Sequence, residues 1–174
     1  MNMRRNIFAY VGAALVVAFS FVMMPSMNVC SAYAYYHPTP AYIDAAEAAI
    51  GGVQIGSKRE YIRDIYGEPT RIEKGTSVFG DYEYWYYGDS FKIYLMYGAY
   101  YVESNADNGL KTPAGFTVGQ YIQPVIDYFG SDTMKKSIHK GVTTYSFYVQ
   151  AYKGIGFQTD RRGKITKIYC WEDL

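Results

Sequence analysis

Residues 57–69 have the hydrophobic pattern of a short amphipathic helix. Their apolar side chains recur with helical spacing and fall on one face: Tyr61, Ile62, Ile65 and Tyr66. Ser57 and Glu60 have the spacing of a capping box at the start of this helix. Gly67 and Pro69 provide a stop, because glycine accepts the left-handed conformation and proline cannot continue a helix. A helix this short needs a sheet to pack against.

Aromatic and β-branched residues dominate the segments that follow this helix. Between Gly and Asp turns they predict antiparallel strands at 82–87, 91–97 and 100–103, and later at 143–152, 155–160 and 164–171. The last two strands are expected to form a hairpin across Asp160–Gly163, which has the composition of a type I turn.

The start of the helix returns about 60 residues later in the chain. Thr117 and Gln120 have the spacing of a second capping box, and Pro124 predicts a kink or a restart of the helix. Gly130 is expected to end this second helix. We therefore predict an α+β fold in which two tandem helix-plus-antiparallel-sheet repeats, at 53–106 and 110–174, form one sheet with helices on one face.

The first 34 residues have the pattern of a signal peptide. Arg4 and Arg5 precede an uncharged apolar run from Ile7 to Met24, and Ala32-Tyr33-Ala34 matches a signal-peptidase motif. Cleavage after Ala34 would leave an exported chain, periplasmic or secreted, with no stable membrane span. Residues 35–52 are then expected to form a leader and a short helix over 41–50.

Two alternatives to cleavage place the protein on a membrane. The apolar run is close to the shortest length that spans a bilayer, so an uncleaved segment would act as an anchor. Cys30 raises the alternative of a lipoprotein, although Val29 replaces the small residue that a lipobox has before its cysteine. After cleavage, Cys170 is the one remaining cysteine, so no intramolecular disulfide is expected.

The helix–strand pattern resembles that of a known envelope family. A Ser-capped helix ending in Tyr66-Gly67-Glu68-Pro69, a tryptophan strand and a glycine-turned hairpin together resemble the SmpA/OmlA (BamE-like) family. Two tandem copies are similar in architecture to the secreted beta-lactamase inhibitor protein. The resemblance covers about Val53 to Trp171 and implies this fold and a protein-binding role. The poor lipobox and the lack of disulfides depart from these proteins, so neither specific partner is implied.

The sequence favours binding over catalysis. The whole chain has a net charge of +1, which gives no basic field for nucleic acid. No catalytic, metal-binding or phosphate-binding motif occurs, so we expect no enzyme activity, no cofactor and no metal, with a hydrolase as the least favoured alternative. Residues that could act chemically are expected to be solvated or structural: His37, His139, Cys170, Asp81, Glu83 and Asp89.

Aromatic residues supply the positive evidence, since the chain contains 21 Tyr. Strand alternation predicts a core-facing set: Tyr84, Tyr86, Phe91, Ile93, Leu95, Phe147, Val149 and Phe157. The opposite set is predicted to bind a ligand: Trp85, Tyr87, Tyr94, Met96, Tyr148, Tyr152 and Trp171. We expect a non-catalytic module that binds another envelope or extracellular protein, or assists envelope assembly, through this face. One alternative is a module that binds a glycan or the cell wall. The other is that these aromatic residues only form part of the sheet, as their β-propensity favours, and bind nothing.

Overall fold

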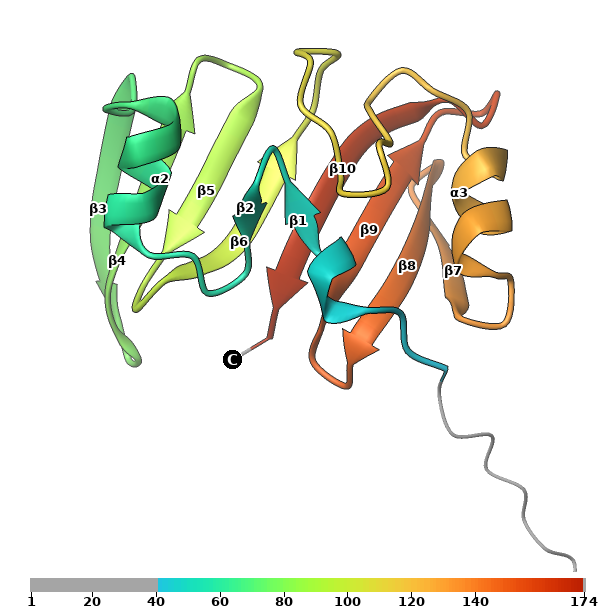
Figure 1. Ribbon diagram of the computed structural model, residues 1–174, viewed down its shortest axis with the longest axis horizontal. Coiled ribbons are helices and arrows are strands. Elements are labelled where there is room, and N and C mark those ends of the chain that lie inside the picture. The colour runs from blue at the N-terminus through green and yellow to red at the C-terminus, as the bar shows by residue number, and fades with distance from the viewer. Residues whose placement is uncertain (1–40, 174) are drawn as a thin grey trace, which may run out of the picture. The chain divides into compact units, whose positions relative to one another are not determined.

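An eight-stranded antiparallel sheet dominates the computed structural model, which describes residues 41–173 (Figure 1). Its strands follow the order β3-β4-β5-β6-β10-β9-β8-β7. Their bounds are Arg71–Ser77 (β3), Gly80–Tyr87 (β4), Phe91–Leu95 (β5), Ala99–Ser104 (β6), Met134–His139 (β7), Val142–Gln150 (β8), Lys153–Thr159 (β9) and Ile165–Glu172 (β10). The predicted signal peptide, with its cleavage site and Cys30, lies outside the described residues.

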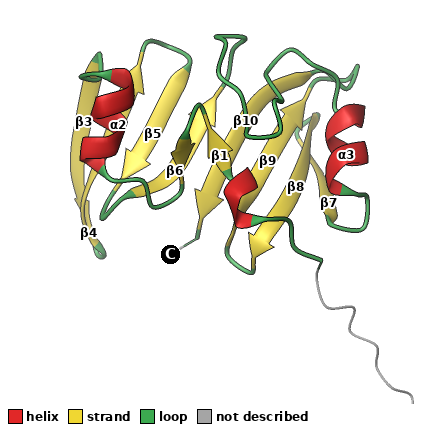
Figure 2. Ribbon diagram, viewed as in Figure 1, coloured by secondary structure: helices red, strands yellow, loops and turns green. Residues whose placement is uncertain are grey.

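The predicted α+β fold of two helix-plus-sheet repeats is wrong. Strands contain far more of the described residues than helices do, and the two α-helices in this part of the chain are short: α2 at Arg59–Tyr66 and α3 at Gln123–Phe129 (Figure 2). The strands belong to one sheet, because β6 pairs directly with β10 through partners such as Val102 and Cys170. Hydrogen bonding therefore runs unbroken through the predicted boundary, and the fold is mostly β.

The predicted capping box of α2 does not form. The Ser57 hydroxyl accepts a hydrogen bond from the Gln54 N–H at 3.0 Å, and the Ser57 carbonyl accepts one from Ala99 at 2.9 Å. These bonds hold Ser57 in the preceding turn, so the helix begins at Arg59 with no side-chain cap. Its predicted end is confirmed, because Gly67 has a φ of 71°.

The second helix begins later than the predicted capping box at Thr117, because residues 117–122 form no helix. Gln120 accepts a hydrogen bond from the Thr117 N–H at 3.2 Å, but this bond starts no helix. The Ile122 N–H donates instead to Gly163 at 3.0 Å, which ties this segment to the start of β10. Helix α3 begins only at Gln123, with Pro124 in its first turn.

The predicted helix over 41–50 is replaced by a short turn and a hairpin. A 3-10 helix, η1, covers only Ala45–Glu47. Strand β1 (Ala49–Ile50) then pairs with β2 (Val53–Gln54). The intervening Gly51 and Gly52 have φ values of 57° and 83°, as a two-residue hairpin turn requires.

One hydrophobic core lies between the sheet and the elements above it. The β1–β2 hairpin, α2 and α3 contribute Val53, Ile62 and Val125, each fully buried. The sheet contributes Trp85, Ile93, Val102, Phe147, Ile155, Phe157, Ile168 and Cys170. In the described residues these elements cover one side of the sheet, which leaves the other side open. No helix in this part of the chain is long and apolar enough to cross a membrane.

Candidate functional site: the aromatic face of the sheet

The register of β4 and β5 decides which tyrosines reach the open side. Tyr87 pairs with Phe91 across the turn at 88–90, so odd-numbered residues of the two strands share a side. Trp85 lies opposite Ile93, and both are fully buried beneath the helices. Tyr84 lies opposite Tyr94 on the open side. The predicted sides of β4 are therefore reversed.

Four of the seven predicted binding residues do not lie on the open side of the sheet. Trp85 belongs to the core, and Met96 is also buried. Tyr87 lies on the helix side, where its ring contacts Tyr66 and its hydroxyl donates to the Gly67 carbonyl at 3.2 Å. Tyr152 occupies the turn between β8 and β9, at one end of the sheet, and is 67% exposed.

The other three predicted residues, Tyr94, Tyr148 and Trp171, lie on the open side together with five tyrosines that the predicted binding set omits. We call this half-buried group the aromatic face: Tyr82, Tyr84, Tyr94, Tyr100, Tyr101, Tyr148, Tyr169 and Trp171. Ring centroids of Tyr84 and Tyr94 are 4.8 Å apart, and those of Tyr148 and Trp171 are 5.4 Å apart. Tyr94 also pairs with Tyr101 across β5 and β6, so the rings form a continuous row. Correct pairing of β4 with β5 would have revealed Tyr84 from sequence.

Glycines in neighbouring strands give several of these rings room to lie on the sheet. A methyl group at Gly154 would collide with Trp171, and one at Gly156 would collide with Tyr169. A methyl group at Gly75 would likewise collide with Tyr82, at the other end of the face. Aromatic rings that cover strand glycines stabilise weak positions of a sheet. They also turn one ring surface toward solvent.

A shallow hollow of about 480 Å³ lies along the row of rings. Its lining residues are Tyr94, Tyr100, Tyr101, Ser146, Tyr148, Tyr169, Trp171, Glu172 and Asp173. The lining combines apolar ring surface with hydroxyl and carboxyl oxygens. It therefore offers stacking area together with hydrogen-bonding groups.

Lys167 and Glu103 form an ion pair on the aromatic face. The Lys167 ammonium lies 3.1 Å from the Glu103 carboxylate, which also accepts a hydrogen bond from the Tyr101 hydroxyl at 2.8 Å. Burial and the neighbouring Glu103 charge raise the pKa of Tyr101, so its ring stays neutral. Lys92 lies over the Tyr84 ring, 4.3 Å from its centroid. The face therefore presents aromatic and hydroxyl groups more than net charge.

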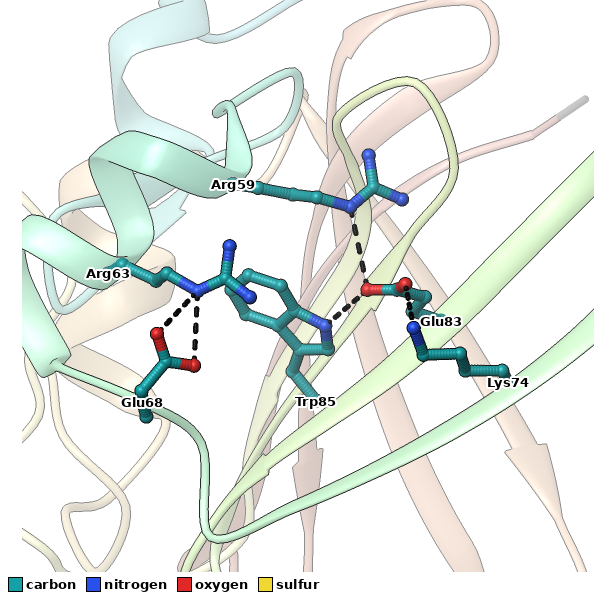
Figure 3. Close-up of polar contacts among 6 residues, drawn as sticks. All are labelled: Arg59, Arg63, Glu68, Lys74, Glu83 and Trp85. Atoms are coloured by element: carbon teal, nitrogen blue, oxygen red, sulfur yellow. Dashed lines mark hydrogen bonds and ion pairs between the residues drawn. The ribbon is translucent and has the colours of Figure 1, made fainter.

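The acidic candidates on the helix side have structural roles (Figure 3). Glu83 accepts a hydrogen bond from the Trp85 indole at 2.7 Å and pairs with Lys74 at 3.2 Å and Arg59 at 3.5 Å. Partial burial raises the pKa of Glu83, but these hydrogen bonds and positive charges outweigh burial and lower it overall. The guanidinium carbon of Arg63 lies 4.6 Å from the centroid of the Trp85 ring, so Arg63 also belongs to this cluster.

The described residues contain no pairing that would activate a nucleophile. Cys170 is fully buried on the core side of β10, and burial raises the pKa of its thiol. His139 is exposed at the end of β7, which lies three strands from β10. Asp81 accepts a hydrogen bond from the Thr76 hydroxyl at 2.7 Å, and no group of His, Cys, Asp and Glu in this part of the chain could hold a metal.

Comparison with known proteins identifies no family. No protein-family model matches the chain, and no curated protein matches it. A solved structure of an extracellular protein containing a SCP domain, from Bacillus anthracis str. Ames, is similar at 14% identity and a TM-score of 0.48. That match covers 68% of this chain and 44% of the other protein. This likeness is too low to transfer a fold or an activity, and the SmpA/OmlA resemblance stays a prediction.

Proposed function

We propose that the chain is an exported, non-catalytic module that binds another envelope or extracellular protein through its aromatic face. The observation that carries this proposal is the continuous row of half-buried rings from Tyr82 to Trp171 on the open side of the sheet. Tyrosine and tryptophan supply large contact area at low conformational cost, and their polar atoms give direction to binding.

The dimensions of the face suit a macromolecular partner. Eight strands spaced about 4.8 Å apart give a width of roughly 34 Å. A standard protein interface buries about 800 Å² on each partner, which a face of this width can supply. Glu103 and Lys167 neutralise each other, so this ion pair would add little to the choice of partner compared with the contact area.

The sequence of the N-terminal segment supports export. Arg4 and Arg5, the uncharged run and the Ala32-Tyr33-Ala34 motif have the order of a secretory signal. The chain is compatible with an oxidising compartment, because Cys170, the one cysteine among the described residues, is buried and so shielded from oxidants.

A glycan or cell-wall polymer is the second candidate, and a specific observation favours it. Trp171 and Tyr169 lie over Gly154 and Gly156, so each ring keeps a surface directed away from the sheet. Sugar rings stack on such surfaces, and the hollow beside them contains hydroxyl groups that can bond to sugar hydroxyls. The protein candidate and the glycan candidate use the same residues.

Binding by variants of the full chain tests the proposal. The test variant is Tyr94→Ser/Tyr148→Ser, and the matched control is Tyr121→Ser, at a tyrosine 62% exposed outside the aromatic face. We expect wild type and control to retain the same partner from an envelope extract, and the test variant to lose it. Loss of binding to purified cell wall, with protein capture unchanged, would instead support the glycan candidate. Equal binding by all three proteins would contradict both.

A further inference from the structure

Charge is unevenly distributed between the two halves of the sheet. Residues 41–110, which include β3 to β6, carry 6 basic and 11 acidic side chains, whereas residues 111–173, which include β7 to β10, carry 9 basic and 5 acidic ones. The resulting net charges of −5 and +4 nearly cancel, so the total of +1 conceals a basic half. From Thr133 to Thr159 the chain contains four lysines and no acidic residue. The basic half therefore includes the β7 edge of the sheet.

Six exposed cations of this half form a strip that begins on β7 and continues over two turns: Lys135, Lys136, Lys140, Arg161, Arg162 and Lys164. The turns β7–β8 and β9–β10 lie at the same end of the sheet, because Thr143 near the start of β8 pairs with Thr159 at the end of β9 (Figure 1). Two strand spacings, about 10 Å, separate these turns, and Lys136 precedes Lys140 by about 13 Å of strand. We call this group the cationic strip.

The positive charges of the cationic strip are available to a ligand. None of its six side chains forms an ion pair within the described part of the chain. Asp160, the one acidic residue in the two turns, accepts hydrogen bonds from the backbone N–H groups of Arg162 and Lys164 at 2.8 and 2.9 Å. The Lys136 ammonium lies 5.2 Å from the centroid of the Tyr145 ring, a contact that does not neutralise its charge. The strip therefore keeps a clear excess of positive charge.

Lys140 occupies a turn position that lysine rarely holds. Lys140 and Gly141 join β7 to β8 with φ values of 49° and 80°, as a two-residue hairpin turn requires. Such turns favour Asn, Asp and Gly at this position. Lys140 is the one residue other than glycine with a positive φ in the part of the chain that the structure describes. The turn therefore holds a charged side chain at the tip of the hairpin against the local preference.

We propose that the cationic strip binds a flexible polymer that carries repeated phosphate groups. Guanidinium and ammonium groups form charge-assisted hydrogen bonds with phosphate oxygens, and each arginine presents a fork of donors that matches them. A polymer brings successive phosphates to successive cations and releases its counterions as they bind. This role is independent of what the aromatic face binds.

The shape of the strip favours a flexible polymer over a flat anionic surface. The strip turns from the end of the sheet onto its β7 edge, where Lys135 pairs with Ser146 on the open side and Lys136 with Tyr145 on the core side. A flexible chain can follow this corner, whereas a bilayer lying on the two turns would not reach β7. Lysines on an edge strand also discourage pairing between sheets, but that explanation does not cover the cations of the turns.

The residues beside the strip favour a polymer without bases. Single-stranded nucleic acid is bound by a series of aromatic rings on which successive bases stack. Tyr121, which forms a β-bridge with Lys164 and is 62% exposed, offers a single ring beside the strip. Its other exposed neighbours, Ile138 and Val142, are aliphatic. We therefore expect recognition of phosphate groups rather than of bases.

Binding of poly(glycerol phosphate), a polymer with neither sugar rings nor bases, tests the proposal on the full chain. Isothermal titration calorimetry at several salt concentrations gives the affinity and its salt dependence. One test variant, Arg161→Gln/Arg162→Gln, removes two charges from a turn, and the other, Lys135→Gln/Lys136→Gln, removes two from β7. The matched control, Lys58→Gln/Lys111→Gln, removes two exposed cations outside the strip and so changes the net charge equally.

We expect each test variant to bind the polymer about tenfold more weakly at low salt. The slope of log affinity against log salt should fall by about 1.4, because each phosphate contact with a flexible polyanion contributes roughly 0.7. The control should bind like wild type, and so should Tyr94→Ser/Tyr148→Ser, which distinguishes this site from the aromatic face. No binding by wild type, or an equal loss in control and test variants, would overturn the proposal.

Two other anions test the choice of ligand. Single-stranded DNA at the same phosphate concentration should bind no more tightly than poly(glycerol phosphate), and tighter binding would assign the strip to nucleic acid instead. Vesicles containing phosphatidylglycerol test a lipid surface. If Arg161→Gln/Arg162→Gln lost binding to vesicles while both test variants kept their affinity for the polymer, a lipid surface would replace the polymer as the ligand.

Discussion

At the scale of single residues, glycines shape the aromatic face as much as its rings do. Gly156 lies beneath Tyr169, and the space that a side chain would fill is taken by the ring. A strand glycine normally weakens a sheet, so replacing it by alanine usually helps by about 0.5–1 kcal/mol. At Gly156 we expect the opposite, because the Tyr169 ring occupies the space that an alanine side chain would need.

The Gly156→Ala variant tests this arrangement. Its methyl group would displace the Tyr169 ring, so we expect the free energy of unfolding to fall by about 1–3 kcal/mol, as for an overpacked site. Gln158→Ala, on the same side of β9, is the control and should change it little. Denaturant unfolding measures both. A gain in stability for Gly156→Ala would show that Tyr169 does not lie over the glycine.

Glu83 is expected to make stability depend on acid pH. The cluster of Trp85, Lys74 and Arg59 lowers the pKa of Glu83 in the folded protein below its ordinary value of 4.5. The unfolded chain therefore takes up the proton first as pH falls, so the contribution is complete above 4.5 and is lost as pH falls through the folded pKa. Wild type should exceed Glu83→Gln in unfolding free energy at neutral pH, and the difference should shrink in acid. A difference that is constant with pH would contradict this role.

Sequence alternation identified part of the aromatic face and missed the rest for a definable reason. Tyr94, Tyr148 and Trp171 lie on the open side, as strand alternation predicted, although the pairing of β8 with β9 shifts directly after Tyr148. Trp85 and Tyr87 were misplaced, because the side of β4 relative to β5 depends on which residues pair across the turn. A shift of one residue in that pairing moves every side chain to the other side.

At the scale of elements, the sequence located the ends of the helices better than their beginnings. Gly67 and Gly130 end α2 and α3 with φ values of 71° and 89°, a requirement that glycine meets locally. The helix starts depend on tertiary bonds instead. Ser57 has cap chemistry, but bonds to Gln54 and Ala99 hold it outside the helix.

The Gly67→Ala variant tests the end of α2. No atom lies within 4 Å of the added methyl group, so the cost comes from the backbone conformation alone. We expect a loss of about 1 kcal/mol or more in unfolding free energy, because alanine tolerates this positive φ poorly. Asp64→Ala, exposed on the same helix, should change it by less than about 0.5 kcal/mol. Equal effects of the two variants in denaturant unfolding would argue against a strained glycine.

At the scale of the whole molecule, the β6–β10 pairing turns two strand groups into one sheet. The pairing joins residues about 66 positions apart, such as Glu103 and Tyr169, and local sequence patterns carry no signal for it. The predicted strands were largely present, but the prediction of two helix-plus-sheet repeats in one sheet rested on local similarity, which did not identify the strands that pair at this join, and the two-repeat arrangement is wrong. The single core on one side of the sheet follows from it.

The continuous sheet predicts cooperative unfolding of the described part of the chain. Trp85 reports on β4 and Trp171 on β10, at opposite sides of the join. Because one core connects both, their fluorescence and the far-ultraviolet circular dichroism should change in one transition with the same midpoint. The single-tryptophan variants Trp85→Phe and Trp171→Phe separate the two signals. Distinct midpoints within each variant would indicate that the halves unfold independently.

The central claim is that the aromatic face is the surface that meets a partner, and photo-crosslinking in producing cells tests it most directly. Benzoylphenylalanine replaces Tyr148 on the aromatic face in one variant and the exposed Tyr121 in another. We predict that ultraviolet light produces a discrete crosslinked species from position 148 and none from position 121. Crosslinks from position 121 alone, or from neither position, would contradict the claim.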